Sequence, residues 1–411
     1  MQVRKKWKFG IIIFLLAFML TGCKSKKEDN TIIFWNPLTG DDGVYMDNMV
    51  KDYNATDPEY PVKPIVTSDM YTKIYTVLTA QDGVPDLTLI HADRVAGFVN
   101  SEMLEPLDDI ISTQPEIKAE NYLPQAWSAG TVDGHQYTVP LDIHSSAMYY
   151  NKKLLKKYDV EYFLDDDVVT FDEMMSLAGK MDDGDFVVNN ALLSWCILAQ
   201  IVNLGGDIEN NGQPTLDTPE VKKAFESLKE VADAGLMTPN GEDGYLMFQS
   251  DNVLFSTDGT WTSTAHDAVE GLDYGVTNVY AYSPDKFTNR GSSHMFSLLR
   301  KDSRSDEKEQ GIADFLEWMR QNSLEWAKAG QIVASQEVVD SPEFKDYKQS
   351  FFTSSPEEVD SLHVFTYEYY PYVEEAINTY CFDIVYGDME IDEGLKTMQK
   401  FVEDKIEEND G

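Results

Sequence analysis

The sequence predicts an α/β protein with two closely packed lobes. Between residues 31 and 90, short apolar runs alternate with helical patterns, which is typical of a parallel, doubly wound sheet. Roughly 380 residues follow the N-terminal leader, which suggests two domains or one large one. The sequence contains no internal repeat and no long low-complexity linker. We therefore expect two α/β lobes in contact rather than two separate domains joined by a linker.

The first part of the pattern is a βαβαβ unit. The three expected strands are residues 31–35, 62–66 and 86–90. Pro64 places the second strand at a sheet edge or a strand end, because proline lacks the N–H that a central strand needs. Two helices are expected between the strands, since apolar residues recur there at helical spacing. These residues are Met46, Met49, Val50 and Tyr53 in the first helix, and Ile74, Val77 and Leu78 in the second.

A hairpin and a further strand follow the unit. Residues 130–141 alternate in a way that fits a hairpin, with Asp133-Gly134 at its turn. The apolar run at residues 147–150 indicates a strand.

The helices of the later part are recognised by their ends. Thr170 and Glu173 form a capping box that opens one helix. Thr218 and Pro219 supply an N-cap and a first-turn proline for another, which Gly235 ends. The last two helices are expected over residues 312–319 and 395–406.

The N-terminus has the pattern of a bacterial lipoprotein leader. Its basic residues are Arg4, Lys5, Lys6 and Lys8. An apolar run over residues 10–20 follows, too short to span a membrane comfortably, and Leu20-Thr21-Gly22-Cys23 ends it. This ending resembles the lipobox, so residues 1–22 are expected to be a signal peptide and Cys23 an acylated N-terminus, with palmitate among its acyl chains. The alternative is an ordinary signal peptide with a chance cysteine.

The remaining composition excludes some functions. The chain has 33 Lys and Arg against 72 Asp and Glu, and the leader holds four of the bases and no acids, so the mature charge is 29 − 72 = −43. Nucleic acid is not expected as a partner, because phosphate binding needs clustered basic residues. Cys196 and Cys381 could form a disulfide or remain buried free thiols. No Cys or His spacing indicates a metal site, and no cofactor is expected.

Several segments, taken in their order along the chain, resemble one family. They are residues 33–43, 83–87, 137–152, 255–261, 291–294 and 325–330. The third includes Tyr137-Thr138-Val139-Pro140 and Tyr149-Tyr150-Asn151-Lys152, and the fourth includes Gly259-Thr260-Trp261. Together they resemble the extracellular solute-binding proteins of ABC transporters, in the carbohydrate-binding group related to maltose-binding protein. His144 and His294 depart from the family pattern in a minor way that bears on ligand choice.

This resemblance implies a periplasmic-binding-protein-like fold, in which a ligand cleft lies between two lobes joined by crossing segments. The expected division is residues 1–22 as leader, 23–30 as a flexible tether, 31–140 and 262–330 as lobe 1, and 141–261 and 331–411 as lobe 2. The family implies a monomer that performs no chemistry on its ligand. It also implies that permease subunits accept the loaded protein, which the lipid would hold at the outer face of the bacterial cell membrane.

Sugar sites combine aromatic faces, which stack on pyranose rings, with planar polar groups that bind hydroxyls. In open α/β sheets, such groups gather at the carboxyl ends of strands. The candidate ligand-binding residues are Trp35, Asn36, Asp41, Asp42, His91, Asp93, Asp142, His144, Trp195, Trp261, Ser293 and His294.

Most of these candidates also have a purely structural interpretation. Asp41 and Asp42 could cap the first helix. His91 and Asp93 could make local turn bonds, and Asp142 and His144 could pair between the lobes. Trp195 could belong to the core. The Tyr residues at 367, 369, 370 and 372 could line the cleft or pack in a C-terminal subdomain. Trp261 follows Gly259, which allows a close approach of the backbone, and the family resemblance makes Trp261 the preferred aromatic platform.

The leading function is a lipid-anchored, non-enzymatic binding protein that captures a sugar or oligosaccharide for an ABC permease. The alternative is a surface glycoside hydrolase, which would need two carboxylates about 5–9 Å apart. A third hypothesis is calcium-dependent adhesion, suggested by the acidic runs at 165–167 and 182–185. Neither run matches the EF-hand ligand pattern.

Overall fold

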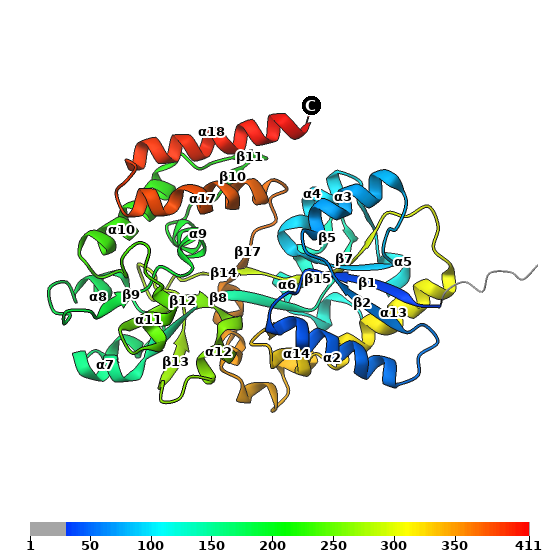
Figure 1. The fold of residues 1–411 in the computed structure, drawn as a ribbon, viewed down its shortest axis with the longest axis horizontal. Helices are drawn as coiled ribbons and strands as arrows, with labels where there is room; N and C mark the ends of the chain where they lie inside the picture. The colour runs from blue at the N-terminus through cyan, green and yellow to red at the C-terminus, as the bar shows by residue number, and fades with distance from the viewer. Residues whose placement is uncertain (1–29, 411) are drawn as a thin grey trace, which may run out of the picture.

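The computed structural model describes residues 30–410, so the leader, Cys23 and most of the tether lie outside it. Figure 1 shows two α/β lobes side by side, joined by strands that run across the middle of the molecule. The α/β class and the two-lobe organisation are therefore confirmed. Across the described range, no helix combines the length and apolar character needed to span a membrane.

The first lobe is built on a six-stranded sheet in the order β2-β1-β3-β15-β4, with β7 paired to β15. The strands are β1 (Ile32–Asn36), β2 (Val62–Val66), β3 (Leu87–His91), β4 (Leu104–Glu105), β7 (Thr138–Pro140) and β15 (His294–Leu299). β1 runs parallel to both β2 and β3, as the predicted βαβαβ unit requires. β2 carries Pro64 and lies at the sheet edge, where a missing N–H is tolerated.

Helices cover both faces of this sheet. The helices α2 (Asp41–Ala55) and α13 (Asp306–Gln321) share one hydrophobic cluster with β1, whereas α3 (Met70–Ala80) and α4 (Val95–Asn100) share another. The arrangement is visible in Figure 1, where the two pairs lie on opposite sides of the strands. Side chains of β1 alternate between the faces, so Phe34 enters the first cluster and Trp35 packs against the second.

The second lobe contains a seven-stranded sheet in the order β17-β14-β8-β12-β9, with β13 and β16 also paired to β8. Its strands are β8 (Asp142–Asn151), β9 (Phe186–Val188), β12 (Val253–Gly259), β13 (Tyr274–Thr277), β14 (Asn289–Ser292), β16 (Ile332–Val333) and β17 (Leu362–Val364). β8 is longer than the strand expected at 147–150. Its first half is polar and buried, so it lacks the apolar pattern from which the sequence identifies strands.

Four longer helices pack together beside this sheet. They are α9 (Leu193–Asn203), α10 (Pro219–Asp233), α17 (Tyr370–Val385) and α18 (Ile391–Asp410). The predicted capping box is present at the start of α8 (Phe171–Met175), and the Thr218 side chain caps α10. Cys196 and Cys381 are both free thiols buried in this cluster. Burial raises the pKa of each thiol to about 12.

Each of two crossings between the lobes is one residue long. Leu141 separates β7 from β8, and Ser293 separates β14 from β15. The N–H of Leu141 donates to the carbonyl of His294 at 2.8 Å, so the crossing segments lie side by side. The first crossing falls where the sequence-based division places it. The second differs, because β13 and β14 pair with β8, although residues 262–330 were assigned to lobe 1.

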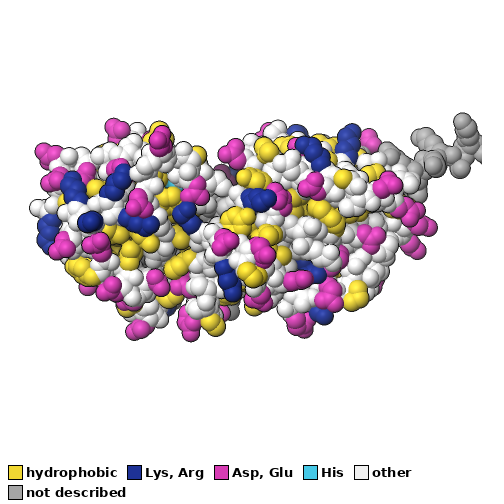
Figure 2. Space-filling model, turned by 90° about the horizontal axis from the view of Figure 1, so that it is seen from below, with side chains coloured by type: hydrophobic (Ala, Val, Ile, Leu, Met, Phe, Trp, Pro, Cys, Tyr) yellow, Lys and Arg dark blue, Asp and Glu magenta, His cyan; other side chains and the backbone are white. Residues whose placement is uncertain are grey.

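The surface carries the acidic charge of the chain. Figure 2 shows Asp and Glu side chains scattered over both lobes, with Lys and Arg among them, and an outline that narrows between the lobes.

Candidate functional site

The candidate site lies between the lobes. Two hollows of about 360 and 370 Å³ share Asp42, His91, Trp261 and His294 as lining residues. His91 is the last residue of β3, and Trp261 follows the end of β12 in the short helix η4 (Thr260–Thr262). The carboxyl ends of strands from both sheets therefore face the same space, as expected for ligand sites on open α/β sheets.

The structure brings most of the predicted site residues to these hollows. Those that line one or both are Asp41, Asp42, His91, Asp93, His144, Trp195, Trp261 and His294. The predicted residues outside the linings are Trp35, Asn36, Asp142 and Ser293.

Trp35 and Asn36 lie away from the hollows for local reasons. Trp35 points to the face of the sheet that α3 covers and packs in that cluster. Asn36 is buried, and its Oδ1 accepts the N–H of Leu38 at 3.1 Å, which shapes the turn before α2. Ser293 is also fully buried, at the crossing itself. These positions end or join strands, as the sequence indicates, but their side chains point into the protein.

Trp261 and Trp195 form the aromatic part of the site. Their rings meet edge to face, with centroids 5.4 Å apart and planes 77° apart. The indole of Trp261 lies directly on the backbone of Gly259, since a Cβ atom there would be 2.2 Å from its ring carbons. Only glycine leaves room for this contact. Both tryptophans are half-buried, so each keeps part of its ring available to a ligand.

Asp258, next to that glycine, is a buried carboxyl whose Oδ1 accepts the N–H of Gly259 at 2.8 Å. Burial raises the pKa of Asp258 to about 7. In the unfolded chain an Asp titrates near about 3.9. As the pH rises from about 4 to 7, the unfolded state therefore ionises while the folded state keeps its proton. This carboxyl lowers the free energy of unfolding progressively across that window.

We expect Asp258→Asn to remove this pH dependence. Going from pH 5 to pH 7, the variant should gain about 1 kcal/mol or more in unfolding free energy relative to the wild type, because one pKa unit corresponds to about 1.4 kcal/mol. Urea unfolding at pH 5 and at pH 7 measures this change in unfolding free energy. Asp183→Asn, at an exposed position, should follow the wild type. Equal pH profiles for Asp258→Asn and wild type would contradict the expectation.

Arg290 is the main site residue that the sequence analysis misses. Its side chain is only 2 % exposed, and its guanidinium carbon lies 3.4 Å from the centroid of a Trp195 ring. Nη2 donates to the hydroxyl of Tyr370 at 2.6 Å and to the carboxylate of Glu374 at 3.1 Å. Tyr370, one of the four tyrosines at 367–372, therefore positions the Arg290 side chain. Its own ring is buried in the core of the second lobe.

Several buried polar atoms in the lining of one hollow have no hydrogen-bond partner among the described residues. They are Asp93 Oδ1, Arg94 Nε, Arg290 Nη1, Ser292 Oγ and Gln331 Oε1. Asp93 and Arg94 lie 3.6 Å apart as an ion pair, and burial raises the pKa of Asp93 to about 6. A buried polar atom without a partner costs about 1–3 kcal/mol. Asp93 Oδ1 and Arg94 Nε are the two atoms of that ion pair, whereas the atoms on Arg290, Ser292 and Gln331 have no such partner. These three favour a ligand with several hydroxyl or similar groups.

Asp142 lies behind the hollow and organises three neighbouring side chains. Its carboxylate accepts Nδ1–H of His294 at 2.7 Å, Nδ1–H of His144 at 3.3 Å and Nε1–H of Trp326 at 2.6 Å. It also accepts the backbone N–H of His294 at 2.9 Å. Burial would raise the pKa of this carboxyl, but the two histidines hold it well below its ordinary value. Both oxygens thus accept hydrogen bonds from the protein itself, as they would if Asp142 and His144 pair between the lobes.

Other lining residues also escaped the sequence analysis. Those with a charged, aromatic, amide or buried hydroxyl side chain are Tyr71, Arg94, Tyr245, Arg290, Ser292, Gln331 and Glu374. Arg290 and Ser292 adjoin or belong to the family-like segment at 291–294, which could have drawn attention to them. The remainder come from helices and loops whose sequences carry no local signal.

The acidic runs behind the adhesion hypothesis lie elsewhere and are partly engaged. Within 182–185, Asp185 accepts the ammonium of Lys157 and the hydroxyl of Tyr158, both at 2.6 Å. These cationic and hydroxyl donors engage the Asp185 carboxylate in structural contacts.

A two-lobe fold with a polar and aromatic hollow between the lobes is that of a binding protein that encloses a small solute. The sequence profile of the family described as bacterial extracellular solute-binding protein matches residues 48–353. This is most of the chain, and the protein therefore belongs to this family. The family and the similar solved structures are binding proteins rather than enzymes.

Individual relatives are distant. The chain is 24% identical over 241 residues to the arabinooligosaccharide-binding protein of Halalkalibacterium halodurans, covering 55% of this chain and 52% of the relative. It thus spans about half the length of that curated relative. Among solved structures, the GacH receptor of Streptomyces glaucescens, studied with acarbose, has a TM-score of 0.76 at 20% identity, covering 91% of this chain and 98% of that one. The sugar-binding protein MalE of Xanthomonas citri has a TM-score of 0.78 at 15% identity, covering 92% and 98%. These structures confirm the fold.

Proposed function

We propose that this protein captures a mono- or oligosaccharide outside the cytoplasm and delivers it to an ABC permease. One observation carries the proposal: two indoles line the same interlobe space as three residues with an unpartnered buried polar atom, Arg290, Ser292 and Gln331. Indole faces suit the C–H faces of sugar rings, and carboxylate, guanidinium, hydroxyl and amide groups suit sugar hydroxyls. The names of the relatives, an arabinooligosaccharide-binding protein among them, support the same solute class.

The two-lobe architecture supports the transport role. A ligand shifts an equilibrium between open and closed lobes only by its preference for one of them. A sugar that contacts Trp261 from one lobe and His91 or Asp42 from the other would favour the closed form. The permease subunits are then the partner that accepts the closed, loaded monomer.

The proposal includes a lipid anchor at Cys23, outside the described residues. The basic and apolar leader that ends in Leu20-Thr21-Gly22-Cys23 supports it. The anchor would hold the protein at the outer face of the bacterial cell membrane, next to its permease.

Replacing Cys23 by serine should release the protein from the membrane fraction or block its maturation, because serine cannot form the thioether. Metabolic labelling with a clickable palmitate analogue, followed by cell fractionation, measures both effects. Cys381→Ser removes a buried thiol instead and should retain the label. Unchanged labelling of Cys23→Ser would show that the lipid is attached elsewhere or is absent.

The purified full-length chain, screened by thermal shift against a glycan panel, tests the proposed function. A matching glycan at 100 times its dissociation constant should stabilise the protein by about 2.7 kcal/mol. Chromatography of that glycan after long incubation should show it unchanged. Stabilisation by amino acids or peptides but by no glycan would overturn the sugar proposal. Turnover abolished by one Asp or Glu substitution would favour the hydrolase alternative.

A further inference from the structure

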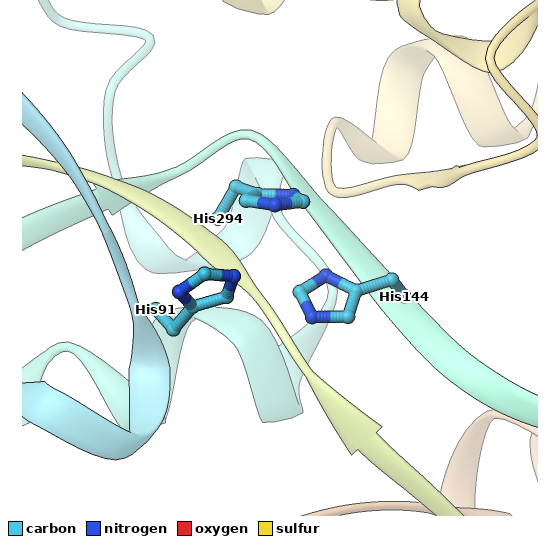
Figure 3. Close-up of side chains that lie close together, drawn as sticks. All are labelled: His91, His144 and His294. Carbon is cyan, nitrogen blue, oxygen red and sulfur yellow. The ribbon is translucent and has the colours of Figure 1, made fainter. Parts of the chain in front are cut away.

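Three histidines that are far apart in the sequence meet at the wall of the hollow. His91 ends β3 and His294 begins β15, and the two are direct partners in the antiparallel register of these strands. His144 lies on β8 opposite Ser292, two residues before His294. Ring centroids are 4.4 Å apart for His144 and His294, 5.0 Å for His91 and His294, and 5.7 Å for His91 and His144. Figure 3 shows the three rings around one shared space.

Each ring is held through its Nδ1 atom. Nδ1 of His144 and Nδ1 of His294 donate to the two oxygens of the Asp142 carboxylate. Nδ1 of His91 lies 2.6 Å from the hydroxyl of Tyr71, which also accepts the backbone N–H of His91. An ionised carboxylate only accepts hydrogen bonds, so it fixes the Nδ1–H form of two rings. Nε2 is then the remaining nitrogen of His144 and His294, and binding through Nε2 of His91 requires that its Nδ1–H donate to the Tyr71 hydroxyl.

One nitrogen from each ring lies within 4.8 Å of the other two. We propose that His91, His144 and His294 bind one divalent transition-metal ion, best fitted by zinc, through their Nε2 atoms. Three imidazoles with an open fourth position are a known zinc donor set, with Zn–N distances of about 2.0–2.1 Å. Such a site spaces its donors about 3.4 Å apart, so zinc would draw the rings together.

The surroundings have the features of a metal site. Ligating histidines commonly donate their other N–H to a carboxylate or similar acceptor, which is the role Asp142 has for two of these rings. Imidazole ligands suit zinc, copper and nickel, whereas calcium and magnesium prefer oxygen. Asp42 and Asp93 line the same hollow and offset Arg94 and Arg290, which oppose a cation there.

The fourth position of the ion would face the hollow. A hydroxyl or carboxylate oxygen of the solute could occupy it, so the metal would take part in recognition. The assignment itself does not rest on the proposed sugar function, since the histidines are arranged independently of the solute.

The test uses the purified full-length chain, stripped with a chelator and studied without any glycan. Equilibrium dialysis against zinc, followed by elemental analysis, should find one tight equivalent, and cobalt(II) should give the visible absorption of a tetrahedral site. Zinc should raise the melting temperature, and calcium and magnesium should not. His91→Gln and His144→Gln should each weaken zinc binding at least 100-fold. His135→Gln, at an exposed histidine outside the cluster, should bind as the wild type does.

Circular dichroism of the apo variants controls for folding, so a loss of zinc in a folded variant is a loss of ligands. Absence of tight zinc binding by the wild type, or equal binding by the wild type and both cluster variants, would overturn the assignment. Zinc binding without any glycan binding would support this site and overturn the sugar proposal. Glycan binding without zinc binding would support the sugar proposal and overturn this site.

Discussion

Replacing Trp261 by alanine should weaken solute binding by more than tenfold, which is about 1.4 kcal/mol, and leave the unliganded fold largely intact. The indole is half-buried, lies against the backbone of Gly259 and meets the edge of Trp195. Its position is therefore fixed before a ligand arrives, so stacking on a sugar ring freezes few rotamers. Calorimetric titration with a glycan found by the screen measures the affinity.

Trp318→Ala is the matched control. Trp318 is also half-buried, but it packs against Tyr53 on the outer side of the first lobe, with ring centroids 5.7 Å apart. This variant should lower the melting temperature and leave the affinity of the folded protein unchanged. If Trp261→Ala behaved in that way, its indole would be part of the core rather than of the site.

Replacing Asp142 by alanine should cost about 3–5 kcal/mol of unfolding free energy in the unliganded protein. The carboxylate is fully buried and accepts hydrogen bonds from His144, His294 and Trp326. Its removal leaves these donors without an acceptor in the interior, so each contributes a desolvation cost. Urea unfolding without ligand measures the loss.

Asp41→Ala provides the comparison, since this exposed carboxyl in the first turn of α2 should affect stability by less than about 1 kcal/mol. A small stability loss for Asp142→Ala with a large loss of glycan affinity would show that Asp142 contacts the solute directly. That outcome would favour the ligand interpretation over the pairing interpretation.

Local patterns predict the fold of this chain well, because they act over a few residues. The apolar stripe of α2, the edge strand around Pro64 and the capping box at Thr170 all form as expected. Strand β8 was only half predicted, since the buried polar residues from Asp142 to Ser146 are stabilised by partners far along the chain.

The site could be predicted only where it follows from strand ends. His91 and Trp261 follow strand ends and line the hollows. Trp35 lies outside the hollows, because the end of a strand does not say which face its last side chains occupy. Arg290 was missed because its partner Glu374 lies 84 residues away. The histidine cluster has no local motif either, since pairing of β3 with β15, and of β8 with β14, brings its members together.

The single-residue crossings at Leu141 and Ser293 restrict how the lobes can move. The two crossing segments are hydrogen-bonded neighbours, so bending one requires bending the other about the same line. The lobes should thus open and close by a hinge rotation about one axis rather than rotate freely in all directions. Atoms travel in proportion to their distance from that axis. The three histidines lie on strands beside the crossings and should hardly shift, so their arrangement should be the same in the open and closed forms.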